Sequence, residues 1–459
     1  MPKQRIRDPL HNLIEFETGE EFEFCLWRVI QTREFQRLRR IKQLGFSELV
    51  YPGATHSRFA HSVGVFHTAR QLIEVIRRHT QRVEDSKVRE ALAAALVHDL
   101  GHGPFSHAFE SVGKRLGLNM ADHEVVSDAL IRDSKVAEIL RGLGSGFAND
   151  VADVIRGRGN RNIYRAVVSS QFDADRLDYM RRDRLMAGTQ HAAVDFQWLL
   201  ANLEVGNVPY GVDQEQLGEV ETFVLGSKAI YAAEGFVLGL FQLYPTVYLH
   251  KATRGAEKLY TELICRIVEL IRQGLTSKTG LPSNHPLVRF AERPDDLETA
   301  LSLDDSVIWG GLCLMMDAED RGVAEAARRL HDRNLYKCFD VRTMLTDPAN
   351  SDPAYEIELE RSLAEIKEKL TTWSAENSRG IPRILIDQAT RSLYRPLEES
   401  KGPLDQINIR TPNGDLVDLS KRSPVVGALQ IFRLFRVYVS REDREAASIV
   451  ETTIKEGQR

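Results

Sequence analysis

Apolar side chains recur every three or four positions along most of the chain, which is the spacing of helices with one buried face. Between positions 20 and 44 this spacing predicts two helices, and Thr32 is suited to cap the second of them. The pattern continues from Phe59 to about Thr80 and through Arg89–Val97. Further long helices are predicted at about 223–244, 245–275, 296–316 and 321–332. The predicted fold class is therefore mainly α.

A few short stretches depart from the helical spacing. Residues 5–19 alternate between polar and apolar and are expected to form a short extended pair or hairpin. Near the C-terminus, residues 406–411 and 415–419 flank a Pro-Asn-Gly turn signal and predict a second hairpin. Leu434–Val439 is a predicted strand, and 441–456 is a predicted final helix. The C-terminal part is thus expected to be a small α+β subdomain.

The chain has 459 residues, more than one hydrophobic core usually organises. We therefore predict a main domain with attached parts. The division that we expect is an N-terminal hairpin and basic helix packed on the core at 1–50, a helical core at 51–260, a helical extension at 261–380 and a C-terminal α+β subdomain at 381–459.

The most informative stretch runs from His98 to His107 and follows the strongly apolar helix Arg89–Val97. A carboxylate or an imidazole carried into an apolar interior costs several kcal/mol unless it is hydrogen-bonded, ion-paired or bound to a metal. One isolated histidine would be interpreted as a core residue with a satisfied hydrogen bond. Here His98 and Asp99 are adjacent and two more histidines follow, which favours a metal site.

Other titratable residues support that interpretation. Eight of the 13 histidines fall between His56 and His123, a density that core packing alone does not explain. His61 lies near the start of its predicted helix. If residues 172–183 are helical, Asp175 shares a face with Tyr179 and Arg182. Alternating acids and bases usually mark a solvent-exposed face. Asp175 is therefore a candidate metal ligand only in combination with His61, His98 and Asp99.

Composition narrows the choice of partners and compartment. A hydrophobic fraction of 42% and a charged fraction of 28% are ordinary for a soluble globular protein. The net charge of −5 provides no basic field, so nucleic acid is disfavoured as the main partner. The four cysteines are far apart and are expected to be reduced core residues. We expect a cytoplasmic protein without a signal peptide or a membrane span, since no apolar run is long enough.

Four motifs together resemble one known family. They are Arg58-Phe-Ala-His61-Ser62, the block from His98 to His107, Asp122-His-Glu124 and Asp173-Ala-Asp-Arg-Leu-Asp-Tyr179. The chain resembles the HD-domain metal-dependent phosphohydrolases, and most of all the branch that contains the animal SAM-and-HD-domain dNTP triphosphohydrolase and its bacterial relatives. We expect no SAM domain before the motifs. The resemblance covers most of the chain and implies a helical HD-domain core with additional helices and a small C-terminal α+β subdomain.

The resemblance also implies roles for individual residues. It implies one metal held by His61, His98, Asp99 and Asp175. Two imidazoles and two carboxylates suit iron, manganese, zinc or nickel, and magnesium can accompany the substrate phosphates. The residues implied around the scissile phosphate are His102, His107, Glu110 and His123. The residues implied to bind the phosphates and sugar of the substrate are Gln43, Arg58, Arg176, Tyr179 and Asp183.

A second nucleotide site follows from the same resemblance. A nucleotide effector would bind at a subunit interface of a homo-oligomer, a dimer or a tetramer, through Arg7, Gln31, Arg39, Arg333 and Lys337. Gln31 stands where the animal enzyme uses an acidic residue to read guanine, so the base preference is open. The match is partial around Tyr244–Glu257, from where the ribose 2′-hydroxyl is excluded, so deoxyribose selectivity is open too.

These residues suit hydrolysis of a phosphate ester. A metal lowers the pKa of bound water towards about 7, arginines orient the phosphates, and a protonated histidine donates to the leaving oxygen. Our hypothesis is that His107 is this acid and that Glu110 and His123 hold it, or a neighbouring water, in the needed protonation state. For dNTP triphosphohydrolases the attack is at the α-phosphate and yields deoxynucleoside and triphosphate.

Two other functions are also compatible with the sequence. The first is an HD-type phosphatase or phosphodiesterase that acts on another nucleotide or on a single-stranded nucleic-acid end. The second is a non-catalytic nucleotide-binding regulator, which the complete set of metal ligands and neighbouring histidines argues against. The products released from nucleoside triphosphates distinguish these functions.

Overall fold

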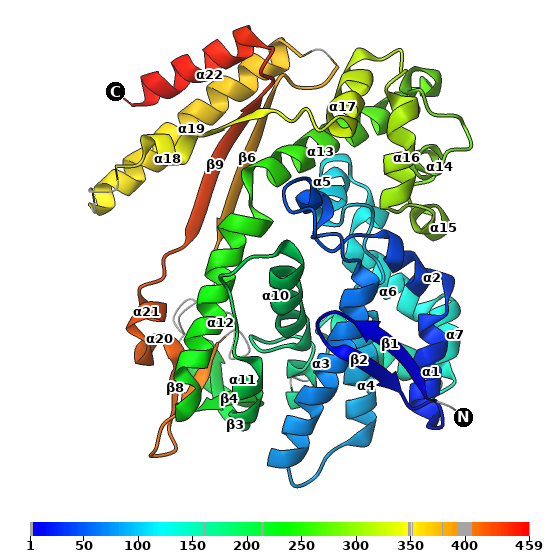
Figure 1. The fold of residues 1–459 in the computed structure, drawn as a ribbon, viewed down its shortest axis with the longest axis vertical. Helices are drawn as coiled ribbons and strands as arrows, with labels where there is room; N and C mark the ends of the chain where they lie inside the picture. Colours follow the sequence, from blue (N-terminus) through cyan, green and yellow to red (C-terminus); the bar gives the residue numbers. More distant parts are fainter. Residues whose placement is uncertain are drawn as a thin grey trace.

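Helices form most of the structure, as the spacing of apolar residues predicts (Figure 1). The structure is a computed structural model and describes residues 3–159, 162–212, 215–347, 350, 352–378, 380–392, 394 and 406–458. No helix in these ranges is long and apolar enough to cross a membrane. The four cysteines are free, and Cys25 and Cys265 are buried as expected. The prediction of a core position was wrong for Cys313, which is exposed, and Cys338 is half-buried.

The N-terminal region begins with the predicted hairpin, which is confirmed as an antiparallel pair. The side chain of Thr32 accepts a hydrogen bond from the backbone N–H of Phe35, so the predicted cap is confirmed as well. The helix that it caps is short, because it tightens into a 3₁₀ turn after Arg37. The elements of this region are β1 (Gln4–Asp8), β2 (Asn12–Phe16), α1 (Glu21–Ile30), α2 (Arg33–Arg37), η1 (Leu38–Arg40) and η2 (Gly45–Leu49).

The central core is built around one long helix, α3, which packs against α4 and α10. Its N-terminus is capped by Ser57, whose side chain accepts the N–H of Ala60. The end of α4 from Ala91 to Val97 is buried, as its apolar sequence predicts. The helices of the core are α3 (Arg58–His79), α4 (Asp85–Val97), α5 (His107–Leu116), η3 (Asn119–Ala121), α6 (His123–Arg132), α7 (Lys135–Arg141), α8 (Phe147–Ile155), α9 (Ile163–Ala166) and α10 (Ala174–Ala187).

A four-stranded sheet in the order β3-β4-β7-β8 packs on the core, with β3 against α3 and β4 against α9. The predicted C-terminal hairpin is confirmed as β7 and β8, and β7 pairs parallel to β4. The helix expected from 223 was wrong at its start, since 223–226 is the end of β4 and α12 begins at Ile230. Thr222 to Leu225 are all buried, and a short buried run has no periodicity that separates strand from helix. The elements here are α11 (Phe196–Ala201), β3 (Leu203–Val212), β4 (Glu215–Gly226), η4 (Ser227–Ala229), α12 (Ile230–Leu243), η5 (Tyr244–Tyr248), β7 (Asn408–Arg410), β8 (Leu416–Asp418), α20 (Leu419–Arg422) and α21 (Pro424–Gly427).

The long helix α13 joins the core to the remaining parts of the molecule (Figure 1). It packs against α5 of the core, α17 of the helical extension and β6 of the C-terminal sheet. The elements of this region are α13 (Lys251–Arg272), η6 (Thr276–Thr279), α14 (Pro286–Glu292), α15 (Leu297–Leu301), α16 (Asp305–Met315) and α17 (Arg321–His331). The prediction of one helix over 296–316 was wrong, because residues 302–304 separate α15 from α16.

The C-terminal sheet has the order β5-β9-β6 with antiparallel pairs, and α19 packs on it beside α22 (Figure 1). The predicted strand and the predicted final helix are confirmed as β9 and α22. Residues after 381 therefore contribute to two different sheets, and the division at 381 stays a prediction. The elements are β5 (Lys337–Asp340), α18 (Val341–Leu345), α19 (Pro353–Glu376), β6 (Ile384–Arg391), β9 (Phe432–Val439) and α22 (Arg444–Gly457).

Candidate active site

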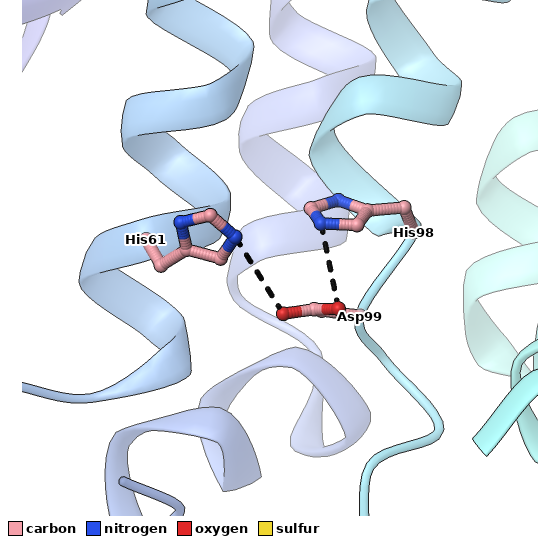
Figure 2. Close-up of side chains that lie close together, drawn as sticks. All are labelled: His61, His98 and Asp99. Carbon is pink, nitrogen blue, oxygen red and sulfur yellow. Dashed lines mark ion pairs between the residues drawn. The ribbon is translucent and has the colours of Figure 1, made fainter. Parts of the chain in front are cut away.

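The four predicted metal ligands come together from three helices. His61 lies in the first turn of α3, His98 and Asp99 follow the end of α4, and Asp175 lies in the first turn of α10. His61 Nε2 is 3.0 Å from Asp175 Oδ1, and His98 Nε2 is 3.4 Å from Asp99 Oδ1 and 3.8 Å from Asp175 Oδ1. Figure 2 shows both imidazole rings directed at the Asp99 carboxylate.

The side chains fit a divalent cation. The Nδ1 atoms are engaged, by Asp178 Oδ2 at 2.9 Å for His61 and by the carbonyl oxygen of Ala95 at 2.9 Å for His98. Within the described residues, neither buried Nε2 atom makes a hydrogen bond. One ligand atom each from His61, His98 and Asp99 lies within 4.8 Å of the others. With the proton on Nδ1, each Nε2 offers its lone pair to an ion, which is the usual arrangement of histidine ligands.

The electrostatics of this cluster also favour a cation. Burial disfavours the charged imidazole of His61, but the Asp175 and Asp178 carboxylates outweigh it and raise the pKa of His61 to about 10. A metal ion bound at Nε2 would therefore replace a proton. Burial likewise favours the neutral form of Asp99, yet Arg58 and the neighbouring histidines hold its pKa well below the usual value. The carboxylates thus stay ionised and attract positive charge.

The predicted catalytic residues form a second group that touches the first. His102 Nε2 is 3.2 Å from Asp99 Oδ1, and the rings of His102 and His123 stack with centroids 4.1 Å apart. Glu110 Oε1 is 2.6 Å from His123 Nδ1 and 3.2 Å from His107 Nδ1. Despite its burial, these two histidines hold the pKa of Glu110 well below the usual value. His107 is the exposed member, since 74% of its side chain is accessible.

Gly101 allows α6 to approach the His98–Asp99 turn. A Cβ atom at Gly101 would lie 2.1 Å from the carbonyl oxygen of His123 and 2.4 Å from the backbone nitrogen of Ser127. We expect Gly101→Ala to destabilise the protein by about 1–3 kcal/mol, because the backbone of α6 has to move. His123 moves with it, so kcat should fall as well. Urea unfolding and steady-state kinetics measure the two effects.

The control for this substitution is Gly310→Ala in α16, where a Cβ atom would meet no atom within 4 Å. Alanine there should leave activity unchanged and stability equal or higher, since alanine favours a helix over glycine. Equal unfolding curves for the wild type and Gly101→Ala would contradict the expected clash.

The two predicted phosphate-binding arginines each adjoin a metal ligand, because Arg58 pairs with Asp99 and Arg176 follows Asp175 in α10. Arg58 is buried, pairs through Nη1 with Asp99 Oδ2, and donates from Nε to Ser106 Oγ at 2.8 Å. Arg176 is about one-third exposed, and its Nη1 donates to Gln171 Oε1 at 2.7 Å. Both guanidinium groups are thus held in place by neighbouring side chains.

The predicted sugar-binding residues include a buried carboxylate. Asp183 accepts a hydrogen bond from Tyr248 Oη at 2.9 Å and lies 2.8 Å from His56 Nε2. The ring of Tyr179 is 6.2 Å from that of Tyr248. Gln43 Oε1 is buried and makes no hydrogen bond with the described residues. The structure therefore brings Tyr179 and Asp183 together, and it adds His56 and Tyr248, to which we had assigned no role.

The five predicted effector residues are dispersed over the chain. Arg7 donates to Asn12 in the N-terminal hairpin, Arg39 lies 3.5 Å above the ring of Phe59, and Arg333 donates to the carbonyl oxygen of Leu49. Gln31 follows α1, and Lys337 begins β5. In the described part of the chain, no hydrogen bond or ion pair joins two of the five. The effector site stays a prediction.

The residues behind His61 were not predicted from the sequence. Asp178 is fully buried and contacts His61 Nδ1, His11 Nε2 and the guanidinium group of Arg182. Asp178 follows Asp175 by three positions and therefore shares a helix face with it, a signal that could have been used. His11 carries no such signal, because it is 167 positions away from Asp178.

This helical core, with two imidazoles and two carboxylates gathered beside a histidine–glutamate group, is that of a metal-dependent phosphohydrolase. Residues 58–183 match the HD domain model. The uncharacterized protein YwfO of Bacillus subtilis is 31% identical over 437 residues, which cover 92% of this chain and 88% of that protein. The chain belongs to the HD-domain phosphohydrolase family, as predicted.

Two further proteins are similar to this chain. A Dictyostelium discoideum homolog of the deoxynucleoside triphosphate triphosphohydrolase SAMHD1 is 29% identical over 329 residues, which cover 69% of this chain and 57% of that protein. A phosphohydrolase of known structure from Bacteroides thetaiotaomicron is 25% identical, with a TM-score of 0.72 over 96% of this chain and 100% of that one. The mainly α fold is thus confirmed.

Proposed function

We propose that this phosphohydrolase cleaves deoxynucleoside triphosphates into deoxynucleoside and triphosphate. The observation that carries the proposal is the position of Asp99, which contacts both metal-ligand histidines and His102 of the catalytic group. A phosphate at the metal is therefore also beside the imidazoles. The choice of a deoxynucleoside triphosphate is supported by the similarity to the SAMHD1 homolog.

The metal ligands in this proposal are His61, His98, Asp99 and Asp175. A divalent iron, manganese, zinc or nickel ion at this position supplies a Lewis acid that neutralises phosphate charge and lowers the pKa of water. The Nδ1 contacts of His61 and His98 leave their Nε2 atoms available to hold such an ion. Arg58 keeps Asp99 ionised, so the cluster stays ready to bind a cation.

The remaining residues bind the substrate and deliver a proton. Arg58 and Arg176 bind the phosphates, and Gln43, Tyr179 and Asp183 bind the sugar. Water adds to the α-phosphorus, the bond from phosphorus to the 5′ oxygen breaks, and His107 donates its proton to that oxygen. The ionised Glu110 lies between His107 and His123 and orients the ring of His107.

Product analysis tests the proposal. We expect the metal-loaded protein to release triphosphate and deoxynucleoside from at least one dNTP, as resolved by anion-exchange chromatography. Each dNTP and NTP is tested alone and in pairs, because activity that needs a second nucleotide supports an effector site. Release of orthophosphate or of a nucleoside monophosphate would contradict the proposal and favour a phosphatase or phosphodiesterase. The His98→Ala protein controls for contaminating enzymes.

A further inference from the structure

We propose that the turn of the N-terminal hairpin is part of the metal centre, and that His11 and Asp8 position the metal ligand His61 through Asp178. The inference rests on the proposed role of His61 as a metal ligand. His11 and Asp8 lie at the two ends of the turn between β1 and β2, far from the HD-domain motifs in sequence. Both reach the interior, because the side chain of His11 is 2% exposed and that of Asp8 is 4% exposed.

Asp178 is the link between the hairpin and the metal ligand. Its Oδ2 accepts hydrogen bonds from His61 Nδ1 at 2.9 Å and from Arg182 Nε at 2.8 Å. Its Oδ1 accepts from His11 Nε2 at 2.7 Å and from Arg182 Nη2 at 3.0 Å. Both oxygens are thus fully used in a site closed to water, where neither side chain of the pair Asp178–Arg182 is exposed. A carboxylate held by four donors keeps one orientation.

Asp8 shapes the turn and also anchors the arginine. Its Oδ1 accepts the backbone N–H groups of Leu10 and His11, each at 2.9 Å. This is the local hydrogen bonding by which aspartate stabilises tight turns, and it sets the direction of His11. Its Oδ2 accepts from Arg182 Nη1 at 2.7 Å. The hairpin therefore holds Asp178 twice, directly through His11 and indirectly through Asp8 and Arg182.

The packing around the Asp178–Arg182 ion pair leaves little room for another arrangement of these two side chains. A Cβ atom on Gly64 of α3 would lie 2.2 Å from both Arg182 Nη2 and Asp178 Oδ1, so the ion pair lies directly against the backbone of α3. The glycine, three positions after His61, thus lets the buried network reach the ligand from behind. This explains why a small residue is needed at position 64.

The network has a consequence for the affinity of the metal. Asp178 keeps the proton of His61 on Nδ1 and so leaves Nε2 free to bind an ion. The two carboxylates Asp8 and Asp178 carry one more charge than Arg182 alone can neutralise, which adds to the attraction for a cation at His61. Loss of His11 leaves Asp178 Oδ1 with one donor fewer, so the carboxylate and the ring of His61 can turn.

The experiment measures metal affinity rather than turnover. The full-length chain is stripped of metal and titrated with Co²⁺ in competition with a chromophoric chelator. We expect His11→Ala to weaken Co²⁺ binding about 10-fold to 100-fold, the usual effect of removing a partner of a ligand. His11→Gln should bind within about threefold of wild type, because the glutamine amide can replace Nε2 as donor to Asp178. Asp8→Asn, which keeps the turn but loses the charge against Arg182, should weaken binding as well.

Asn12→Gly is the matched control in the same hairpin. Asn12 has a positive φ of 62°, which glycine adopts freely, and its side chain contacts Arg7 but not the Asp178 network. It should bind Co²⁺ like wild type. Wild-type affinity in His11→Ala would overturn the inference, and so would an equal loss in His11→Gln or in Asn12→Gly. If the variants bind Co²⁺ as expected but the protein hydrolyses no dNTP, only the proposed function is contradicted.

Discussion

His98→Ala is expected to remove the bound metal and to lower the rate of phosphate-ester hydrolysis by about 10³-fold or more. The expected size follows from the several kcal/mol of charge stabilisation that a catalytic metal supplies, at about 1.4 kcal/mol per factor of ten. Among the described residues, the side chain of His98 makes one hydrogen bond outside the metal-ligand cluster, with the carbonyl oxygen of Ala95 near the end of α4. The fold should therefore survive the substitution.

Metal content by atomic emission and kcat on the same preparation check this expectation. His79→Ala is the control, because His79 is exposed at the end of α3 and far along that helix from His61. Chelation of the wild-type protein should reproduce the loss, and added metal should restore the wild type but not His98→Ala. Full metal content in His98→Ala, with activity unchanged, would remove His98 from the ligand set.

Most of the fold could be predicted from periodicity because most of its elements are helices with one buried face. The exceptions are segments that are buried on all sides. The end of β4, from Thr222 to Leu225, is such a segment, and the sequence pattern there is equally compatible with a helix. The parallel pairing of β4 with β7 joins residues 225 and 409, and no local pattern encodes so distant a contact.

The candidate site shows the same division between local and distant information. His98, Asp99 and His102 are close in sequence, and the cost of burying them was enough to indicate a cation. His61 and Asp175 were added by the family resemblance, and the geometry now brings them to the same cluster. The contacts behind the metal ligand His61 could not be predicted, since nothing in the hairpin sequence indicates that His11 reaches Asp178.

His107→Ala is expected to lower kcat by about 10²-fold to 10⁴-fold while metal content stays at the wild-type level, because the substitution removes a general acid and no ligand. His107 is the most exposed member of its group, so stability should change little. Its Nδ1 faces the Glu110 carboxylate at 3.2 Å, which directs Nε2 away from Glu110. Glu110→Gln should act in the same direction, because it removes the carboxylate that orients the His107 ring through Nδ1.

The control is Lys114→Ala, an exposed position on the same helix α5 that takes no part in the cluster. If His107 is the acid, substrates whose leaving group needs no proton, such as a p-nitrophenyl ester, should be hydrolysed by His107→Ala nearly as fast as by wild type. A natural substrate should retain the full defect. Loss of metal from His107→Ala would instead place His107 among the ligands, and an equal defect on both substrates would assign it to binding, because only a proton donor distinguishes good from poor leaving groups.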